Sequence, residues 1–332
     1  MSPLIHRLLN SYQHRFPLVP APFARLARDT GASEDEILKS FAMLEASGHL
    51  SRIGAVFRPN TIGASSLAAL QVPPADLDRV AGIVNAYAGV DHNYERDHPV
   101  NLWFVLTAPD AECLAGSLRD IENRAGYPLL RLRLVEPYHI DLGFDIDDPA
   151  RTAKRLAAGR GPGWVCMSDD DRRLVGVLQS GLPLSARPYQ AIAEQAETTE
   201  AGVIERIDQW SRVGVIQRFG VIVRHRALGY TANAMAVWNV PDDEVTHIGT
   251  ALAGAPRVTL CYRRTRALPV WPYNLYCMVH GRERGEVREV LASLNHGFNL
   301  EKFEHSVLFR VRELKQTGAR YVFPTGTQHE VH

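Results

Sequence analysis

The chain has 332 residues, a length that predicts two domains or slightly more, each able to bury its own core. Its 37 Lys and Arg residues balance its 37 Asp and Glu residues, so the overall charge gives no support for nucleic acid or an anionic membrane as the partner. No apolar run reaches the roughly 18–20 residues of a membrane helix, and the four cysteines lack the spacing of metal ligands. We therefore expect a cytoplasmic protein with no membrane partner.

The first 50 residues predict three short helices, and a strand follows them. The helices are expected over the apolar start of the chain, over Pro22–Arg28 and over Ser33–Ala46. Ser33 precedes an acidic turn with the capping-box pattern Ser-x-x-Glu, and Gly48 lies where the third helix should end. The strand Arg52–Arg58 resembles the wing of a winged helix-turn-helix domain.

The next segment alternates strands and helices in the order strand, helix, strand, strand, helix, strand. This order is typical of a ferredoxin-like sheet. The strands are expected near Ser66–Val72, Gly89–Arg96, Asn101–Thr107 and Leu129–Leu142, and the helices near Ala75–Tyr87 and Ala111–Asn123.

The second half of the chain repeats the first. Gly54 and Gly220 match across the repeat and lie 166 positions apart, and Gly48 and Gly214 keep the same offset. Two related units are therefore fused into an internal pseudo-dimer. The repeated elements are three helices within Arg172–Gly214, a wing strand Arg218–Arg224, strands near Thr231–Val240, Arg257–Arg264, Tyr273–His280 and Leu300–Arg312, and helices near Asp242–Ala253 and Arg284–His296.

The predicted fold class is α+β: two fused copies of a winged helix-turn-helix domain followed by a ferredoxin-like α/β sandwich domain. A linker rich in Gly, Pro and Arg separates the two copies. The expected boundaries are residues 1–60 and 61–148 in the first half, a linker at 149–166, and residues 167–226 and 227–325 in the second half.

A winged helix followed by a ferredoxin-like domain resembles the Lrp/AsnC family of transcriptional regulators, which makes DNA binding one hypothesis. The local charges argue against it. Residues 1–50 hold five basic and five acidic residues, and residues 169–214 hold five basic and eight acidic ones. A domain that approaches DNA phosphates normally presents a basic face. Fusing two different copies also removes the symmetry that palindromic operators mirror.

The densest group of polar side chains is expected on the second and third strands of the first half. Side chains alternate along a strand, so His92, Tyr94 and Arg96 should lie on one face, with His98 beside them at the turn. A solvated sheet face is the alternative interpretation. Two imidazoles, a phenol and a guanidinium in one place are more typical of a functional site, and we expect these four residues to be the catalytic group.

The equivalent segment of the second half keeps part of this pattern. A Tyr-x-Arg pattern and an Asn-Leu-aromatic pattern recur, whereas the two histidines are absent and arginines are added. We therefore expect the first half to supply titratable groups and the second half to supply fixed positive charge. The polar and aromatic residues of the second segment are Tyr262, Arg263, Arg264, Arg266, Trp271, Asn274 and Tyr276.

These two segments resemble the paired signatures of the siroheme decarboxylases, Lrp/AsnC-like enzymes of haem d1 and alternative haem biosynthesis. The resemblance covers essentially the whole chain, includes the segment Arg312–Tyr321, and fits the fused form in which two subunit types are joined. It implies that siroheme loses carbon dioxide from its acetate groups at positions 12 and 18, giving 12,18-didecarboxysiroheme. No cofactor is expected, since the iron belongs to the substrate. Association with another copy or with sister decarboxylase subunits stays open.

The residue types fit such a substrate. Siroheme is a flat apolar disc rimmed by carboxylates, so its site needs aromatic walls and several arginines. A regulator of transcription and a tetrapyrrole carrier without catalysis are the alternative functions. The expected substrate-binding residues are Asn101, Trp103, Tyr262, Arg263, Arg264, Arg266, Trp271, Asn274 and Tyr276, with Arg52, Arg58, Arg218 and Arg224 on the wing strands as further candidates.

The chemistry requires a proton donor. Loss of carbon dioxide leaves an electron pair that the ring must accommodate, and a proton must then reach the methylene carbon. His92 or His98 is expected to be this acid, because a histidine titrates near neutrality and can exchange its proton between turnovers. Either histidine could instead be an axial ligand to the substrate iron. We expect no metal site that belongs to the protein itself.

Overall fold

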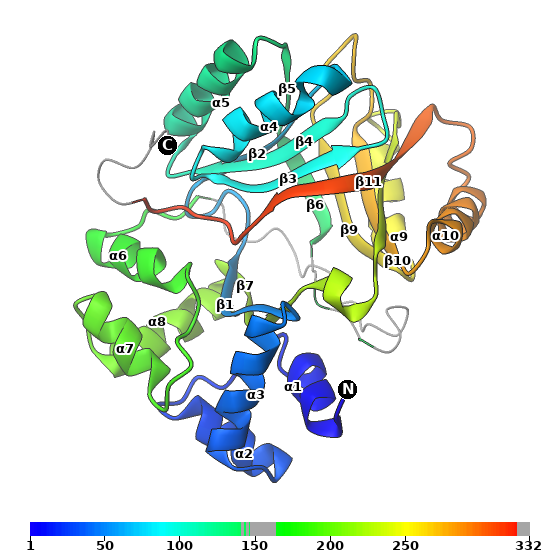
Figure 1. Ribbon diagram of the computed structural model, residues 1–332. Coiled ribbons are helices and arrows are strands. Elements are labelled where there is room, and N and C mark those ends of the chain that lie inside the picture. Colours follow the sequence, from blue (N-terminus) through cyan, green and yellow to red (C-terminus); the bar gives the residue numbers. More distant parts are fainter. Residues whose placement is uncertain (141–142, 144–145, 147–163, 324–332) are drawn as a thin grey trace. The chain divides into compact units, whose positions relative to one another are not determined.

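The computed structural model describes residues 1–140, 143, 146 and 164–323 (Figure 1). Most of the predicted linker, residues 149–166, lies outside the described residues. The chain divides into two compact units. One contains the helix-turn-helix segments of both halves and the other contains the ferredoxin-like segments of both halves. The boundaries within each half stay predictions.

The helix-turn-helix unit has the same plan in both halves, three helices followed by a strand. None of the described helices of the chain combines the length and the apolar character needed to cross a membrane. The helices of this unit are α1 (Pro3–Ser11), α2 (Pro22–Thr30), α3 (Glu34–Ala46), α6 (Asp169–Leu178), α7 (Pro188–Gln195) and α8 (Glu200–Val213), and its strands are β1 (Leu50–Phe57) and β7 (Ile216–Val223).

The predicted helix caps are confirmed. The Ser33 hydroxyl accepts a hydrogen bond from the Glu36 amide, and the Glu36 carboxylate accepts one from the Ser33 amide at 2.8 Å. In the second half the Thr199 hydroxyl accepts from the Gly202 amide at 3.1 Å. These bonds satisfy amide groups that the first turn of a helix leaves without partners.

The two wing strands pair with each other. β1 and β7 form an antiparallel two-stranded sheet in which Gly54 lies opposite Gly220. A Cβ atom at position 220 would collide with the backbone carbonyl oxygens of Tyr12 and Gln13. The glycine that marks the repeat in the sequence is therefore required in the second half by the close approach of the chain after α1.

The ferredoxin-like unit is built around a nine-stranded sheet with the order β5-β2-β4-β3-β11-β8-β10-β9-β6. The first four strands of this order, β5 to β3, come from the first half, the next four, β11 to β9, come from the second half, and β6 of the first half lies at the far edge. The helices of the unit are α4 (Leu77–Asn85), α5 (Ala111–Ala125), α9 (Val245–Ala253) and α10 (Arg284–Gly297), and the strands are β2 (Ala64–Leu70), β3 (Val90–Arg96), β4 (Leu102–Ala108), β5 (Leu129–Leu132), β6 (Leu134–Ile140), β8 (Ala232–Trp238), β9 (Val258–Arg264), β10 (Leu275–Gly281) and β11 (His305–Gln316).

One predicted strand was wrong. The segment expected as a single strand, Leu129–Leu142, forms two strands that break at Arg133, and residues 141–142 lie outside the described residues. β5 pairs with β2 of its own half, whereas β6 pairs with β9 of the second half. Thr265 fixes the break, because its amide donates to the Arg133 carbonyl and its hydroxyl accepts from the Arg133 amide, both at 3.0 Å.

The last strand makes the reciprocal exchange. β11 pairs with β8 of its own half over His305–Phe309 and with β3 of the first half over Arg310–Gln316. The strand starts five residues later than the predicted Leu300 and runs four residues beyond Arg312. The residues beyond the predicted end extend the pairing with β3. The last strand of each half therefore pairs with a strand of the other half.

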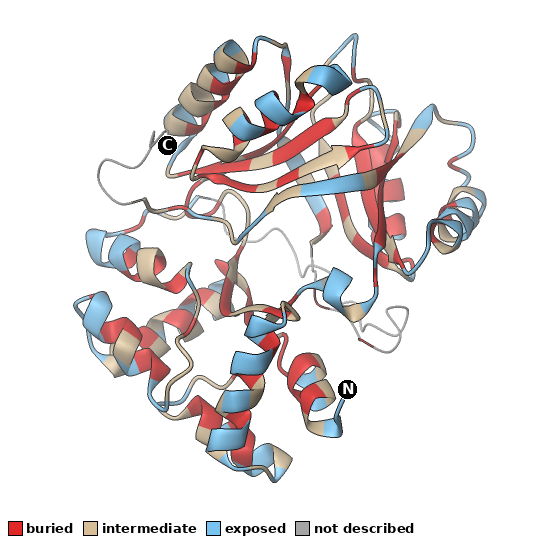
Figure 2. Ribbon diagram, in the orientation of Figure 1, coloured by how far each residue is buried: buried red, intermediate tan, exposed pale blue. Residues whose placement is uncertain are grey.

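Three apolar cores stabilise this unit. α4 and α5 cover one part of the sheet and α9 and α10 cover another, and each pair buries its own core (Figure 1, Figure 2). The third core lies on the face of the sheet that carries no helices and draws on both halves. It includes Trp103, Trp271 and Tyr276, which are at most 1% exposed. Burial of an apolar side chain contributes about 2 kcal/mol or more to stability, so the fusion of the halves is part of the fold.

Candidate active site

Three of the four predicted polar residues, His92, Tyr94 and Arg96, lie in a row on β3. The ring centroids of His92 and Tyr94 are 5.9 Å apart, and the guanidinium carbon of Arg96 lies 5.9 Å from the Tyr94 ring centroid. Asn93, between His92 and Tyr94, points to the helix-covered face, where its amide donates to Asn85 at 2.9 Å. The three predicted side chains therefore share the face opposite to α4, as the alternation of a strand requires.

His92 is held by a carboxylate that the sequence did not single out. Its Nδ1 lies 2.7 Å from Oδ1 of Asp91, which is 4% exposed, and the Thr107 hydroxyl donates to Asp91 Oδ2 at 3.3 Å. An ionised carboxylate only accepts hydrogen bonds, so the proton of a neutral His92 ring is on Nδ1. Nε2 is then the acceptor nitrogen of the neutral ring.

A backbone irregularity explains why Asp91 escaped prediction. Neighbouring residues on a regular strand face opposite sides of the sheet. The pairing of β3 with β4 shifts register between Val90 and His92, which makes Asp91 an additional residue at that point. Such a bulge redirects a side chain, and here it places two consecutive side chains within hydrogen-bond distance.

Arg96 is a buried cation. It is 6% exposed, its Nη1 donates to the Leu308 carbonyl at 2.9 Å, and its Nε finds no hydrogen-bond partner among the described residues. Burial lowers the pKa of the Arg96 guanidinium to about 10. A guanidinium in this position favours an anionic ligand, because burying an unneutralised charge is costly.

The strand exchange brings a second arginine to the same place. Arg310 on β11 lies opposite Arg96 in the strand register, and its guanidinium carbon is also 5.9 Å from the Tyr94 ring centroid. The Glu313 carboxylate forms an ion pair with the Arg310 guanidinium at 3.0 Å. Burial and the nearby Glu313 carboxylate raise the pKa of Tyr94, so its phenol keeps its proton. The sequence carried no signal for Arg310, since β11 was expected to stay within its own half.

The second half contains a partial copy of this arrangement. The Arg264 guanidinium carbon lies 4.6 Å from the Tyr262 ring centroid, Nη1 donates to the Leu132 carbonyl at 2.7 Å, and Nε lacks a hydrogen-bond partner in the described part of the chain. The residues around this pair are apolar, however. Where the first centre has Arg310, Glu313, Gln316 and His92, the register of β6 and β9 places Leu134, Pro137, Ile140 and Leu260. Within the described residues, the full polar set therefore occurs once.

His98 has different neighbours from His92. Its Nδ1 accepts a hydrogen bond from the Val100 amide at 3.0 Å, and its ring centroid lies 5.4 Å from that of Trp271. Burial lowers the pKa of His98. The ring also lines a hollow of about 610 Å³ at the end of the first-half sheet, formed by Gln71, Val72, Pro73, Pro74, His98, Pro99, Val100, Asn101, Tyr127, Pro128, Leu130 and Val270.

Four of the predicted aromatic residues lie inside the third core. Trp103 and Trp271 have ring centroids 4.9 Å apart, and Tyr262 and Tyr276 are stacked at 5.7 Å. The Trp103 indole donates to the Val100 carbonyl and the Trp271 indole to the Tyr276 hydroxyl, each at 2.7 Å. These groups are packed and satisfied, so their part in binding a macrocycle stays a prediction.

Two predicted asparagines hold the backbone. The Asn101 side chain accepts from the Val72 amide at 3.0 Å and donates to the Val72 carbonyl at 2.8 Å. Asn274 makes the same pair of bonds to Val240, at 3.0 and 2.9 Å. The recurring Asn-Leu-aromatic pattern thus corresponds to a structural clamp in both halves.

Arg263 and Arg266 share a carboxylate away from the β3 row. Asp242 lies 2.7 Å from Arg263 and 2.8 Å from Arg266. Arg266 also donates to the Pro272 carbonyl at 2.8 Å. Both cations therefore already have Asp242 as a counter-ion. Their proposed contact with a substrate stays a prediction.

The four wing arginines belong to the helix-turn-helix unit. Arg58 donates to the Gly214 carbonyl at 3.1 Å, Arg218 is 6% exposed, and Arg52 and Arg224 lie on or beside the same strands. Their contact with a substrate also stays a prediction.

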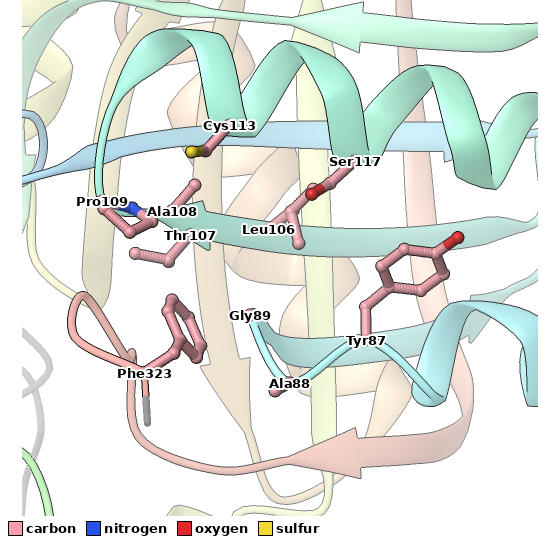
Figure 3. A pocket seen from close by; sticks show the side chains of 10 residues that line it. All are labelled: Tyr87, Ala88, Gly89, Leu106, Thr107, Ala108, Pro109, Cys113, Ser117 and Phe323. Carbon is pink, nitrogen blue, oxygen red and sulfur yellow. The ribbon is translucent and has the colours of Figure 1, made fainter. Parts of the chain in front are cut away.

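A small cavity lies beside α5 and the start of β3 (Figure 3). Its volume of about 20 Å³ suits one water molecule. Tyr87, Cys113, Ser117 and Phe323 are among the side chains around it (Figure 3). Among the described residues, no group of three or more His, Cys, Asp and Glu side chains is arranged to hold a metal ion.

Both types of segment match known families. A family of AsnC-like ligand-binding domains matches residues 62–136 and 227–315, and a family of siroheme decarboxylase NirDL-like helix-turn-helix domains matches residues 6–50 and 171–216. The fold and the site therefore define a fused, two-copy protein of the Lrp/AsnC architecture.

Comparison over the full length is more specific. The chain is 44% identical over 319 residues to the siroheme decarboxylase NirDL subunit of Paracoccus denitrificans, covering 96% of this chain and 97% of the relative. The crystal structure of a siroheme decarboxylase NirDL in complex with an iron-uroporphyrin III analogue superimposes with a TM-score of 0.69 at 28% identity, covering 96% and 93% of the two chains. A separate NirL subunit from Stutzerimonas stutzeri is 47% identical over 148 residues, 45% of this chain and 87% of its own. The chain belongs to the siroheme decarboxylase family, whose members are enzymes.

Proposed function

We propose that the chain removes carbon dioxide from the two acetate side chains of siroheme at positions 12 and 18, giving 12,18-didecarboxysiroheme. The observation that carries the proposal is one centre in which a carboxylate-held histidine, His92, lies in the same row as a buried guanidinium, Arg96. The family supports the same reaction, and the structure of a relative in complex with an iron-uroporphyrin III analogue supports a tetrapyrrole ligand.

The arginines suit the rim of the substrate. A guanidinium binds carboxylates through paired hydrogen bonds, and it remains charged at neutral pH. Arg96 and Arg264 each keep a buried Nε without a hydrogen-bond partner in the described residues. An arginine on the reacting carboxylate would stabilise the ground state and slow its loss. We therefore assign the arginines to carboxylates that the product retains.

His92 supplies the proton. The bond between the methylene carbon and the carboxylate breaks, its electron pair enters the conjugated ring, and carbon dioxide leaves. The methylene carbon then takes one proton from Nε2 of the protonated His92 imidazolium and becomes a methyl group, which leaves the neutral ring with its proton on Nδ1. The His92 side chain is 31% exposed, so solvent can return the proton before the next turnover. His98 remains the candidate for a second acid or an axial ligand to the substrate iron.

The proposed setting of the enzyme follows the sequence expectations. The two halves act as an internal pseudo-dimer in the cytoplasm, and siroheme is the partner molecule. Because a relative exists as a separate NirL subunit, association with sister subunits or with a second copy belongs to the proposal. DNA is not favoured, since α3 begins with three acidic residues and α6 with another three.

The test is anaerobic incubation of the purified protein with siroheme, followed by mass spectrometry of the tetrapyrrole. Loss of two carbon dioxide molecules supports the decarboxylase. Siroheme that stays bound and unchanged would support the carrier instead. Absence of binding together with salt-dependent binding of DNA would support the regulator. A His92→Gln variant distinguishes chemistry from binding, because it should bind siroheme and release carbon dioxide more slowly, by about 100-fold or more.

A further inference from the structure

We propose that Arg310 and Arg96 form a two-arginine site for a carboxylate of the tetrapyrrole, and that Glu313 occupies this site until the ligand displaces it. The inference rests on the proposed function and adds a residue from the second half to a centre that the sequence places in the first. The ligand class is a macrocycle with peripheral carboxylates.

The two arginines are close and poorly hydrated. They lie opposite each other on β3 and β11, and both guanidinium carbons are 5.9 Å from the Tyr94 ring centroid. Arg96 is 6% exposed and the Arg310 side chain 10% exposed. Like charges repel strongly where water is scarce, so this pair is stable only with negative charge beside it.

Among the described residues, one carboxylate is in direct contact with this pair of arginines, while the charge of Asp97 also acts on Arg96. Glu313 binds Arg310 at 3.0 Å. The next carboxylate along the strand, Asp97, is engaged elsewhere, since it binds Arg284 at 2.9 Å and accepts from the Phe309 amide at 2.6 Å. Glu313 pairs with Arg310 and makes no ion pair with Arg96 within the described residues, so a carboxylate that contacts both guanidinium groups is favoured at this point.

Glu313 is suited to give way. Its side chain is 27% exposed, and it lies three residues from Arg310 on the same strand. Glu313 pairs with Arg310 alone, whereas a ligand carboxylate can contact both arginines. Displacement of Glu313 therefore replaces contact with one arginine by contact with two.

The same strands offer a matched control. A register shift between Arg310 and Arg312 turns Arg312 to the other face, where it pairs with Glu95 and lies 2.8 Å from Asp78. Arg310–Glu313 and Arg312–Glu95 are thus two Arg–Glu pairs on the same two neighbouring strands, one beside Tyr94 and one away from it. Only the first pair should respond to a ligand.

The experiment is an absorbance titration with iron-uroporphyrin III, repeated with haem, which carries fewer carboxylates. Arg310→Gln should weaken binding of iron-uroporphyrin III about tenfold or more, and haem binding much less. Glu313→Gln should tighten it by roughly threefold, since the competing carboxylate is gone. Arg312→Gln and Glu95→Gln should bind within about twofold of the wild type.

Three outcomes would overturn the inference: normal binding by Arg310→Gln, binding by Glu313→Gln as weak as that of Arg310→Gln, or no binding of the porphyrin by the wild type. Arg310→Lys, which keeps the charge, and thermal unfolding of each variant separate loss of the site from loss of the fold. Siroheme turnover is measured in parallel. A wild type that binds the porphyrin but releases no carbon dioxide refutes the proposed function alone, whereas turnover with an unaffected Arg310→Gln refutes the arginine site alone.

Discussion

Asp91 determines which nitrogen of the neutral His92 ring carries the proton. The 2.7 Å contact between the Asp91 carboxylate and His92 Nδ1 fixes both the ring orientation and the position of its proton. Asp91 is 4% exposed and receives a further hydrogen bond from Thr107, so the pair is held rigidly. Asp91 acts through His92 and touches no substrate in the proposed reaction, which makes it a positioning residue.

Asp91→Asn should lower the rate of carbon dioxide release about 10- to 100-fold while siroheme still binds, because the amide can hold His92 in the wrong tautomer. Single-turnover mass spectrometry measures the rate, and an absorbance titration measures binding. Asp78→Asn is the control, since Asp78 is a surface partner of Arg312 with a side chain 83% exposed. Equal rates for wild type and Asp91→Asn would remove Asp91 from the mechanism.

Arg96 is predicted to reduce stability in exchange for ligand binding. Its pKa of about 10 in the folded protein lies below that of an unburied arginine. Between these values the unfolded chain holds a proton that the folded chain has released, so the free energy of unfolding rises with pH in that window. Below pH 10 both states are charged and the full penalty of burial remains.

Replacement of Arg96 by Met should therefore leave the protein as stable as the wild type or more stable, by about 1–2 kcal/mol at neutral pH. The same variant should lose most of its affinity for iron-uroporphyrin III. Denaturant unfolding at pH 7 and above pH 10 provides the check, because the stability advantage of Arg96→Met should shrink as the wild-type penalty fades. A large loss of stability at pH 7 would contradict this account.

At the scale of elements, periodicity and capping were sufficient for most helices and strands. The Ser33 box predicted the start of α3, and alternation placed His92, Tyr94 and Arg96 on one face of β3. These are local features, set by the chain within a few residues. Local patterns are what a single sequence reports well.

The features that local patterns missed are those that depend on pairing between the halves. No local pattern around Arg133 predicts that β6 pairs with β9 of the other half. No local pattern around Arg310 predicts that β11 pairs with β3. The bulge at Asp91 is likewise a property of the pairing with β4. The residues of the polar centre on β3 could therefore be predicted from the sequence, whereas Arg310 and Glu313 on the neighbouring β11 could not.

The paired wings allow a direct test of one element. Gly220→Ala should destabilise the protein by about 2 kcal/mol or more, because its Cβ would overlap the Tyr12 and Gln13 carbonyl oxygens and the strand would have to shift. Gly116→Ala, in the interior of α5 with open space around it, should instead stabilise by about 0.5–1 kcal/mol. Urea unfolding of both variants measures the change in the free energy of unfolding. Similar changes at the two sites would mean that the close approach of the backbone is not what requires glycine at position 220.

At the scale of the whole molecule, fusion has allowed two equivalent positions to diverge. Both halves keep an arginine over a tyrosine, Arg96 over Tyr94 and Arg264 over Tyr262. Only around the first pair are a histidine and a strand-exchanged arginine found in the described residues. A symmetric dimer of identical chains would have to keep both centres alike, so divergence requires the fused or two-subunit arrangement.

We predict that both acetates react, one after the other, at the single polar centre found in the described residues. His92→Gln should then slow the first and the second loss of carbon dioxide alike, by about 100-fold or more. If the second half held an independent centre, this variant would release one carbon dioxide at the normal rate and stop. Leu260→His should not rescue His92→Gln, because Leu134 and Pro137 stand where the working centre has Arg310 and Glu313. A time course that resolves siroheme, the mono-decarboxylated species and the final product distinguishes these cases. If one centre is used twice, the mono-decarboxylated species rises and falls in the wild type and forms slowly in His92→Gln.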